Sequence, residues 1–475
     1  MKLRLFYIFS FLIFIATCAQ IAIHPLTDPD LGWHLAGGQW ILENGAVPWK
    51  DPLSNQGNHW INYSWLAEIL FYKFLNIGGH NGLGILQTFL SLISSLVIYS
   101  LARKTADKLP STEEGKICIA VISSLLAVFL IAPFWHLRPQ LIGVIAVGAL
   151  MLIDRRDKRA LSYFSIIEIP LANIHIYWIF IPLVWIFYRG TNDADCGSDT
   201  WTKRFSHGAF LIILGVISPY GLNNFQPIFS YAFNHSVAYG LIDEFQPLFE
   251  MPLECLACLI VALLSCIGIS GKRSYKNLQL PLLFFLATIG QRKYLAIFAV
   301  FVTPLLTTGI ARLLPKSGAA TGIAAKRVIW FELVLIALVA LNSPWLLDNN
   351  QLGERQLGLL NAQQVLLSAS SGKDGAILTH LNDGGWLEYW MSYASKEKRL
   401  KTVIDGRTLV MGEKKLAQYL SVSKRESGSC EVVEQWGAAW AILPVGSSLE
   451  SLLQDECKRW YKIKADSLYS VWVQN

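Results

Sequence analysis

The segment Thr27-Asp28-Pro29-Asp30 follows directly after the first strongly apolar stretch of the chain, residues 5–23. A pair of carboxylates beside a membrane is energetically costly and therefore usually belongs to a functional site. Here the pair opens a loop, from His24 to Tyr63, that is rich in Trp, His and Gly. These four residues direct the search for both the fold and the site.

The rest of the chain has the composition of a membrane protein. Of its 475 residues, 53% are hydrophobic and only 16% are charged, which is fewer charges than soluble proteins carry. A membrane-spanning helix needs about 20 mostly apolar residues, and eleven stretches approach this length. They lie at 5–23, 83–102, 117–134, 139–153, 160–173, 175–188, 206–218, 253–270, 278–290, 294–313 and 328–347. The sequence predicts a polytopic α-helical membrane protein with about eleven transmembrane helices.

The distribution of basic residues predicts the orientation. Loops on alternate sides carry twenty Lys and Arg against five, and the richer side is cytoplasmic by the positive-inside rule. We therefore expect a bacterial inner-membrane protein with a cytoplasmic N-terminus and a periplasmic or extracellular C-terminus. The helices exclude the outer membrane, which holds barrels. The net charge of +6 follows from the cytoplasmic loops, so we expect no nucleic-acid partner.

Two domains follow from the pattern. Residues 1–347 form the transmembrane domain, with a first outer loop at 24–82, and 348–475 form a small α/β domain outside. Within the latter, the pattern predicts helices at 361–370, 385–393 and 411–420, and two more around the strand at 439–443. Further strands are expected at 376–379, 401–404, 460–464 and 468–473. We find no nucleotide-binding motif that would indicate a pump.

The cysteines give little direction. Cys430 and Cys457 lie in the outer domain, where either a disulfide or two free thiols is compatible with the sequence. Cys255-x-x-Cys258 resembles half of a metal site, but it lies in an apolar span without a second half. We therefore predict no bound metal from the cysteines.

Two helices are expected in the first outer loop. Asp28 suits a helix N-cap because Pro29 follows it, and Asn44-Gly45 is a usual helix end. The apolar and aromatic side chains between them suggest a helix lying in the membrane interface. A second amphipathic helix is predicted from Ser64 to Leu75.

Cationic residues gather near the outer ends of three pairs of spans. They occur in Trp135-His136-Leu137-Arg138-Pro139-Gln140, in Asn173-Ile174-His175 and in Gln291-Arg292-Lys293-Tyr294. A carboxylate can take a proton from a hydroxyl nucleophile, and Arg and Lys can hold a phosphate as it leaves. The carboxylates of Asp28 and Asp30 together with this cation cluster indicate a cleft that binds a phosphorylated substrate.

This constellation and topology resemble the GT-C class of integral membrane glycosyltransferases, and in particular the bacterial relatives of protein mannosyltransferases and aminoarabinose transferases. The residues that carry the resemblance are Asp28-Pro29-Asp30-Leu31-x-Trp33-His34-Leu35, Gly45-x-x-Pro48, Asp51-Pro52-Leu53-Ser54, Trp60-x-x-x-x-Trp65-Leu66, Arg138-Pro139-Gln140, Asn173-x-His175, Ser218-Pro219-Tyr220-Gly221, Asp243-Glu244-Phe245 and Asp405-Gly406-Arg407. The match runs thinly along the whole chain, and its strength lies in the order and sidedness of these motifs. The chain departs from related sequences at Ile176 and Tyr177, where small residues are expected.

The resemblance implies roles for these residues. It implies that Asp30 is the catalytic base and Asp28 its neighbour. We expect a cation group made of Arg138, Arg292, Lys293 and His175 to hold the phosphate of a polyprenyl-phosphate sugar. We expect the substrate or acceptor to contact Trp33, His34, Trp60, Asp243, Glu244 and Arg407. A divalent cation is compatible with this site, but the few carboxylates nearby do not require one.

Each candidate also has a structural interpretation. Asp28 and Asp30 can serve the helix start and its dipole, and Arg138 can anchor at headgroups. Arg292-Lys293 can be a plain connector, and Asp405-Gly406-Arg407 a strand-end turn with an internal ion pair. The histidines can be satisfied hydrogen-bonders, and the tryptophans interfacial anchors.

Three functions remain open. The favoured one is an inverting glycosyltransferase that moves a sugar from a polyprenyl-phosphate carrier to an envelope glycan, lipid or protein at the outer membrane face. The second is a transporter or flippase for a lipid-linked glycan, which would place ionisable residues near the midplane. The third is a non-catalytic protein of envelope assembly. The sugar, the acceptor and the oligomeric state do not follow from the sequence.

Overall fold

The computed structural model describes residues 2–188, 200–233, 237, 240–269, 277–314, 352–370, 374–394 and 400–475. Its contacts divide the chain into two compact units. The helical unit comprises Met1–His24, Gly84–Gly221 and Asp243–Asn349, and the mixed unit comprises Pro25–Leu83, Leu222–Ile242 and Asn350–Asn475. Each is described by itself.

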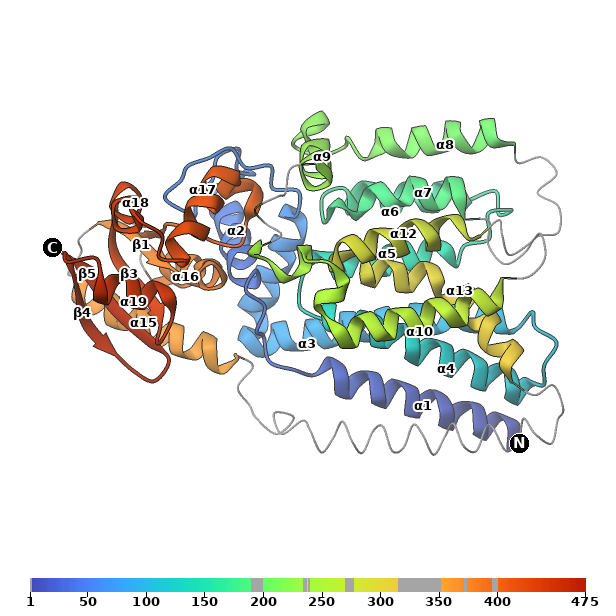
Figure 1. Ribbon diagram of the computed structural model, residues 1–475. Helices are drawn as coiled ribbons and strands as arrows, with labels where there is room; N and C mark the ends of the chain where they lie inside the picture. The colour runs from blue at the N-terminus through green and yellow to red at the C-terminus, as the bar shows by residue number, and fades with distance from the viewer. Residues whose placement is uncertain are drawn as a thin grey trace. The chain divides into compact units, whose positions relative to one another are not determined.

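The helical unit is a set of apolar helices packed side by side (Figure 1). Its helices are α1 (Lys2–Ala22), the later part of α3 (Trp65–Ala106), α4 (Glu113–Ile131), α5 (Pro139–Met151), α6 (Ala160–Leu171), α7 (Phe180–Phe187), α8 (Trp201–Leu214), α10 (Pro252–Gly268), α12 (Gln279–Gly290) and α13 (Leu295–Leu313). Local sequence sets several starts. Thr112 accepts a hydrogen bond from Gly115 N before α4, and Pro139 and Pro252 stand at first helical positions.

The helices coincide with ten of the predicted spans, and the eleventh, 328–347, lies outside the described residues. Among the described residues, four helices are long and apolar enough to cross a membrane, and five apolar helices are shorter. The four are Arg4–Ala22, Trp65–Ala106, Glu113–Phe134 and Arg292–Leu313. The protein is thus a multi-pass membrane protein.

The mixed unit contains a sheet covered by helices. Within the described residues the sheet has five strands in the order β2-β1-β3-β5-β4. The strands are β1 (Gly375–Thr379), β2 (Leu400–Thr402), β3 (Ala438–Pro444), β4 (Trp460–Ala465) and β5 (Tyr469–Gln474). β2 and β3 run parallel to β1, whereas β5 runs antiparallel to both β3 and β4. The helices of this segment are α15 (Glu354–Ser370), α16 (Leu381–Ala394), α17 (Thr408–Ser423), α18 (Ser429–Gln435) and α19 (Ser448–Asp455). The predicted alternation of helices and strands is confirmed, and Cys430 forms a disulfide with Cys457.

The first outer loop differs from the prediction at its start. Its helix, α2 (Leu31–Asn44), has Asp30 as the N-cap residue, two positions after the predicted Asp28. Asp28 instead accepts a hydrogen bond from the backbone N–H of Asp30 at 2.7 Å. An aspartate side chain can bond the backbone two residues on and form such a turn. The predicted end is confirmed, because Gly45 closes the helix at φ 65°.

The interfacial position predicted for α2 is wrong, because this helix is buried inside the mixed unit. Ten of its residues are buried, including apolar and polar ones on several sides. A Cβ added to Gly32 would lie 2.4 Å from the backbone of Trp386 in α16, and one added to Gly38 would lie 2.2 Å from the backbone oxygen of Glu68. Backbones therefore approach α2 closely where glycines remove the side chain.

The second helix of the loop is longer than the predicted 64–75. It is the start of α3, which continues to Ala106 through a non-helical residue, Gly79, at φ 59° and ψ −155°. The kink separates the amphipathic start of α3 from its apolar remainder. The remaining short elements are η1 (Ala132–Phe134), η2 (Ile176–Ile179), η3 (Gly221–Phe225), α9 (Gln226–Phe233), η5 (Asp243–Phe245), η6 (Leu248–Glu250) and η7 (Arg292–Tyr294).

Candidate active site

Asp28 and Asp30 have different surroundings in the mixed unit. Asp28 is 1% exposed, its side chain holds the N–H of Asp30, and its carbonyl accepts a hydrogen bond from Trp386 Nε1 at 2.8 Å. Asp30 is half-buried, and its Oδ1 accepts a hydrogen bond from Trp33 Nε1 at 3.2 Å. Asp28 thus fixes the turn, and Asp30 is the more accessible carboxylate.

The turn Asp405-Gly406-Arg407 lies against Asp30. A Cβ added to Gly406 would lie 2.4 Å from Asp30 Oδ1, so only glycine allows this approach without displacement. The structure thereby brings together two motifs that lie more than 370 residues apart in the sequence.

Arg407 is fully engaged in ion pairs. Its Nη1 donates to Asp51 at 2.8 Å, and its Nη2 donates to Asp405 at 2.7 Å and to Glu388 at 3.1 Å. The guanidinium is 4.7 Å from the centroid of the Trp60 ring, and the Arg407 side chain is 3% exposed. This geometry favours a role in holding the turn. The predicted contact of Arg407 and Trp60 with substrate remains a prediction.

The pKa values of two carboxylates around Arg407 are shifted in opposite directions. Burial, together with the charges of Asp405 and Asp51, raises the pKa of Glu388 well above its usual value, although Arg407 opposes the shift. Burial also acts to raise the pKa of Asp51, but Arg407, Ser54 and the N–H of Leu53 outweigh it and hold that pKa below its ordinary value. The raised pKa of Glu388 favours its neutral form, which reduces the negative charge gathered around a single guanidinium.

His34, one helical turn after Asp30, pairs with the carboxylate of Glu68. Its Nδ1 lies 3.2 Å from Glu68 Oε1, and Asn62 Nδ2 donates to Glu68 Oε2 at 2.6 Å. Both side chains are almost inaccessible, 4% for His34 and 0% for Glu68. Tyr63, whose hydroxyl lies 3.4 Å from that of Tyr231, belongs to the same region, because the charges of Asp30 and Glu68 both act on it. Burial raises the pKa of Tyr63 far above its usual value.

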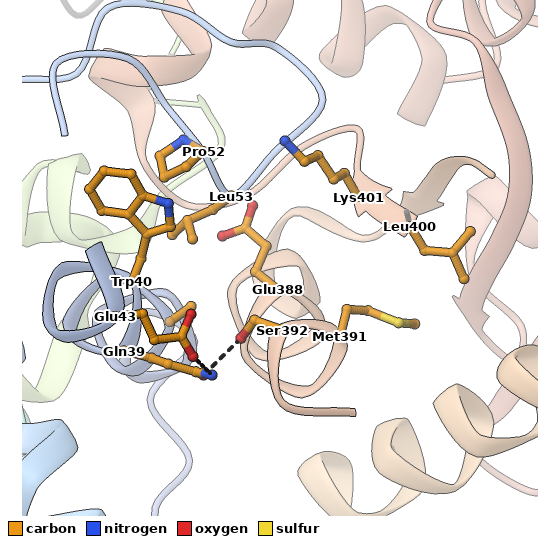
Figure 2. A pocket seen from close by; sticks show the side chains of 11 residues that line it. Gln39, Trp40, Glu43, Pro52, Leu53, Glu388, Met391, Ser392, Leu400 and Lys401 are labelled. Carbon is orange, nitrogen blue, oxygen red and sulfur yellow. Dashed lines mark hydrogen bonds between the residues drawn. The ribbon is translucent and has the colours of Figure 1, made fainter. Parts of the chain in front are cut away.

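A shallow hollow lies at the other end of α2, bounded by α16, β2 and the loop after α2. It contains about 430 Å³ of space, part of it open to solvent. Figure 2 shows Trp40, Gln39 and Glu43 of α2 on one side and Glu388 and Ser392 of α16 on the other. Ser392 Oγ donates to Gln39 Oε1 at 3.1 Å, and Gln39 Nε2 donates to Glu43 Oε1 at 2.8 Å. These polar groups satisfy one another.

The predicted cation group comes together in the helical unit. Arg138, the residue before α5, forms an ion pair with Glu244 of η5. Lys293 Nζ is 4.2 Å from the centroid of the Phe245 ring. The charges of Lys293 and Arg138 both act on His175, whose ring accepts a hydrogen bond from Tyr177 N.

Arg292 is held more firmly than Arg138. Its Nε and Nη2 donate to the two carboxylate oxygens of Glu254, each at 2.5 Å, and its backbone N–H donates to Gln246 O at 3.0 Å. The two acids of the turn, Asp243 and Glu244, therefore lie among the predicted phosphate ligands. From the sequence we expected these acids to contact the substrate or acceptor.

Several partners in these networks were not singled out from the sequence. Glu68, Glu388 and Tyr63 have no motif of their own, and only the tertiary contacts identify them. Asp51 stands in one of the motifs that carry the resemblance, but no role was predicted for it. The one available signal was the acidity of the first loop, which includes Asp51 and Glu68. Within the described ranges, no three His, Cys, Asp or Glu side chains gather as they would around a metal ion.

No protein-family model matches the chain, and no curated protein matches it. Solved structures do. An oligosaccharyltransferase of Archaeoglobus fulgidus, tethered to an acceptor peptide, is 11% identical over 98% of this chain and 74% of its own, with a TM-score of 0.54. ArnT of Cupriavidus metallidurans, bound to undecaprenyl phosphate, is 12% identical over 98% of this chain and 97% of its own, with a TM-score of 0.52. The mycobacterial arabinofuranosyltransferase AftD has a TM-score of 0.51 over 99% of this chain but 41% of its own, at 12% identity.

These neighbours are GT-C class membrane glycosyltransferases. At 11 to 12% identity the likeness establishes the fold. The chain therefore has the GT-C fold, as its motifs predicted.

Proposed function

We propose that the protein is an inverting glycosyltransferase that uses a polyprenyl-phosphate sugar and acts at the outer face of the membrane. The acceptor hydroxyl attacks the anomeric carbon as the bond from that carbon to the phosphate oxygen breaks. The oxygen keeps the bonding electrons and leaves as polyprenyl phosphate, and Asp30 takes the proton of the hydroxyl. A single displacement inverts the anomeric centre.

The observation that carries the proposal is the position of Asp30, a half-buried carboxylate at the start of α2 within a GT-C fold. Asp28 and Trp33 orient this carboxylate, and the Gly406 turn lies beside it. A base on a rigid helix start is pre-organised for one geometry of attack. The oligosaccharyltransferase and ArnT were solved with an acceptor peptide and a lipid phosphate respectively, which supports both kinds of substrate.

The phosphate role is assigned to Arg138, Lys293, Arg292 and His175 in the helical unit. Arg and Lys stabilise the charge that develops on a departing phosphate. Trp33, His34, Trp60, Asp243, Glu244 and Arg407 remain the proposed contacts of sugar or acceptor. In addition to this proposed contact, Arg407 holds the turn beside Asp30 through its ion pairs.

The test is turnover by purified protein in lipid nanodiscs with a panel of radiolabelled polyprenyl-phosphate sugars. Asp30→Asn should reduce release of the sugar from its carrier by about 10²- to 10⁴-fold, because the amide cannot accept the proton. The matched control is Glu43→Gln, which removes an exposed acid at the end of the same helix. It should keep wild-type turnover.

Equal turnover by wild type and Asp30→Asn would show that a residue other than Asp30 is the catalytic base. A folded protein that releases sugar from none of the donors would contradict the glycosyltransferase proposal and favour transport or binding.

A further inference from the structure

The predicted phosphate ligand Arg138 already carries an anion, and that anion comes from the protein itself. Nη1 of Arg138 donates a hydrogen bond to a carboxylate oxygen of Glu244. The two side chains are 17% and 24% exposed, so a ligand from outside has access to the pair. A carboxylate and a phosphate both pair with guanidinium through oxygen acceptors.

The second arginine of the group is paired in a different way. Arg292 binds Glu254 through two parallel hydrogen bonds, and Glu254 stands in the first turn of the 17-residue helix α10. A two-point pair is more stable than a one-point pair. Glu244, in contrast, makes one such bond to Arg138 from a three-residue turn.

The backbone around Glu244 is anchored without the carboxylate. Phe245 is 7% exposed, with Lys293 over its ring, and Gln246 O accepts the N–H of Arg292. Glu244 can therefore leave Arg138 by side-chain rotation while the turn stays in place. The short elements on either side also leave it less constrained than Glu254.

We infer that Glu244 is an internal counter-ion that holds Arg138 until the phosphate of the lipid-linked donor displaces it. The inference rests on the proposed function, because it takes the donor phosphate as the ligand of Arg138. Before the donor binds, Glu244 neutralises a cation that would otherwise attract other anions. Donor affinity is then set by competition between two anions for one guanidinium.

The test measures the dissociation constant of undecaprenyl phosphate for the full-length protein in nanodiscs, independently of turnover. Glu244→Gln should bind this lipid about fivefold more tightly, the limit expected when a partly exposed ion pair no longer competes. Glu250→Gln is the matched control, because it removes the same charge from an exposed residue of the neighbouring element η6. It should leave the constant within about twofold of wild type, since the charge of an exposed residue is screened by solvent and salt.

A double variant makes the test specific. In an Arg138→Gln background, Glu244→Gln should no longer change the affinity, because the pair is already broken. Thermal melting of each variant confirms that it is folded.

Unchanged or weaker binding by Glu244→Gln would overturn the inference while leaving the glycosyltransferase proposal intact. Equal tightening by Glu250→Gln would replace the inference with a general charge effect. Absence of undecaprenyl phosphate binding to wild type would remove the donor-phosphate assignment and this inference together, and the Asp30→Asn comparison would then test the transfer proposal separately.

Discussion

At the scale of single residues, burial decides what each charged group can do. Asp30 keeps an accessible carboxylate. Asp28 has the same chemistry, but it is buried and its carboxylate accepts a hydrogen bond from the backbone N–H of Asp30. Arg407 is a full cation whose nitrogens are bonded to Asp51, Asp405 and Glu388. A buried cation of this kind stabilises the folded protein only while negatively charged or hydrogen-bonding partners compensate its charge.

This balance predicts a dependence of stability on pH. The folded pKa of Glu388 is raised above the ordinary value of 4.5, so its stabilising contribution is complete below that value and is lost as the pH rises through the folded pKa. The melting temperature of wild type should therefore fall from mildly acidic to alkaline pH. Glu388→Gln, which is neutral at every pH, should lose this part of the fall.

The measurement is thermal melting of both proteins in the same nanodiscs across the pH range. Parallel curves for wild type and Glu388→Gln would show that Glu388 is not the titrating group. Asp51 has the opposite sign: its lowered pKa gives stability that disappears only under acid.

At the scale of elements, glycines determine how α2 packs. Gly32, Gly37 and Gly38 each meet a neighbouring backbone or the Glu68 carboxylate where a Cβ would stand. The close approach sets Glu68 against α2 and allows the pair with His34 to form inside the unit. The cost is a helix with three residues of weak propensity.

Gly38→Ala should destabilise the mixed unit, because its Cβ would stand 2.2 Å from the Glu68 backbone oxygen, and backbone must shift to relieve the overlap. We expect a loss of about 1–3 kcal/mol, typical of overpacking. The control is Gly78→Ala in α3, where nothing lies within 4 Å of the added Cβ.

Limited proteolysis and thermal melting report the two outcomes. Gly78→Ala should be neutral or slightly stabilising. Similar melting of the two variants would mean that α2 and α3 are not packed as closely as the structure has them.

At the scale of the whole molecule, the chain alternates between its two units. It enters the mixed unit at Pro25, Leu222 and Asn350, and it leaves for the helical unit at Gly84 and Asp243. The mixed unit therefore joins the predicted C-terminal domain with the first outer loop and with 222–242. Two carboxylates of the first loop, Asp30 and Asp51, depend on residues more than 350 positions away for their surroundings.

The charge asymmetry of the loops predicts the orientation of this molecule. Alkaline phosphatase, which is active only outside the cytoplasm, should be active when fused after Asn475 and inactive when fused after Arg159 in the basic loop before α6. Both fusions should reach similar protein levels. An inactive C-terminal fusion beside an active one at Arg159 would invert the topology and place the mixed unit inside.

Local sequence determined much of this protein. The apolar lengths gave the helices of the membrane, the alternation after residue 350 gave the strands of the sheet, and Gly45 gave the end of α2. These features depend on neighbours within one or two turns, which a sequence displays directly. The prominence of Asp30 also came from its local setting, directly after an apolar span.

Only the tertiary structure decided the partners. Three outcomes depend on contacts across 100 residues or more: α2 is buried against α16, Arg407 is paired with Asp51, and Glu244 is paired with Arg138. Burial and ion pairing depend on which surfaces meet, and the energy of such a pair depends on its desolvation and geometry. The sequence by itself determined the helices, the strands and the candidate base, whereas the fold decided which charges remain available for chemistry.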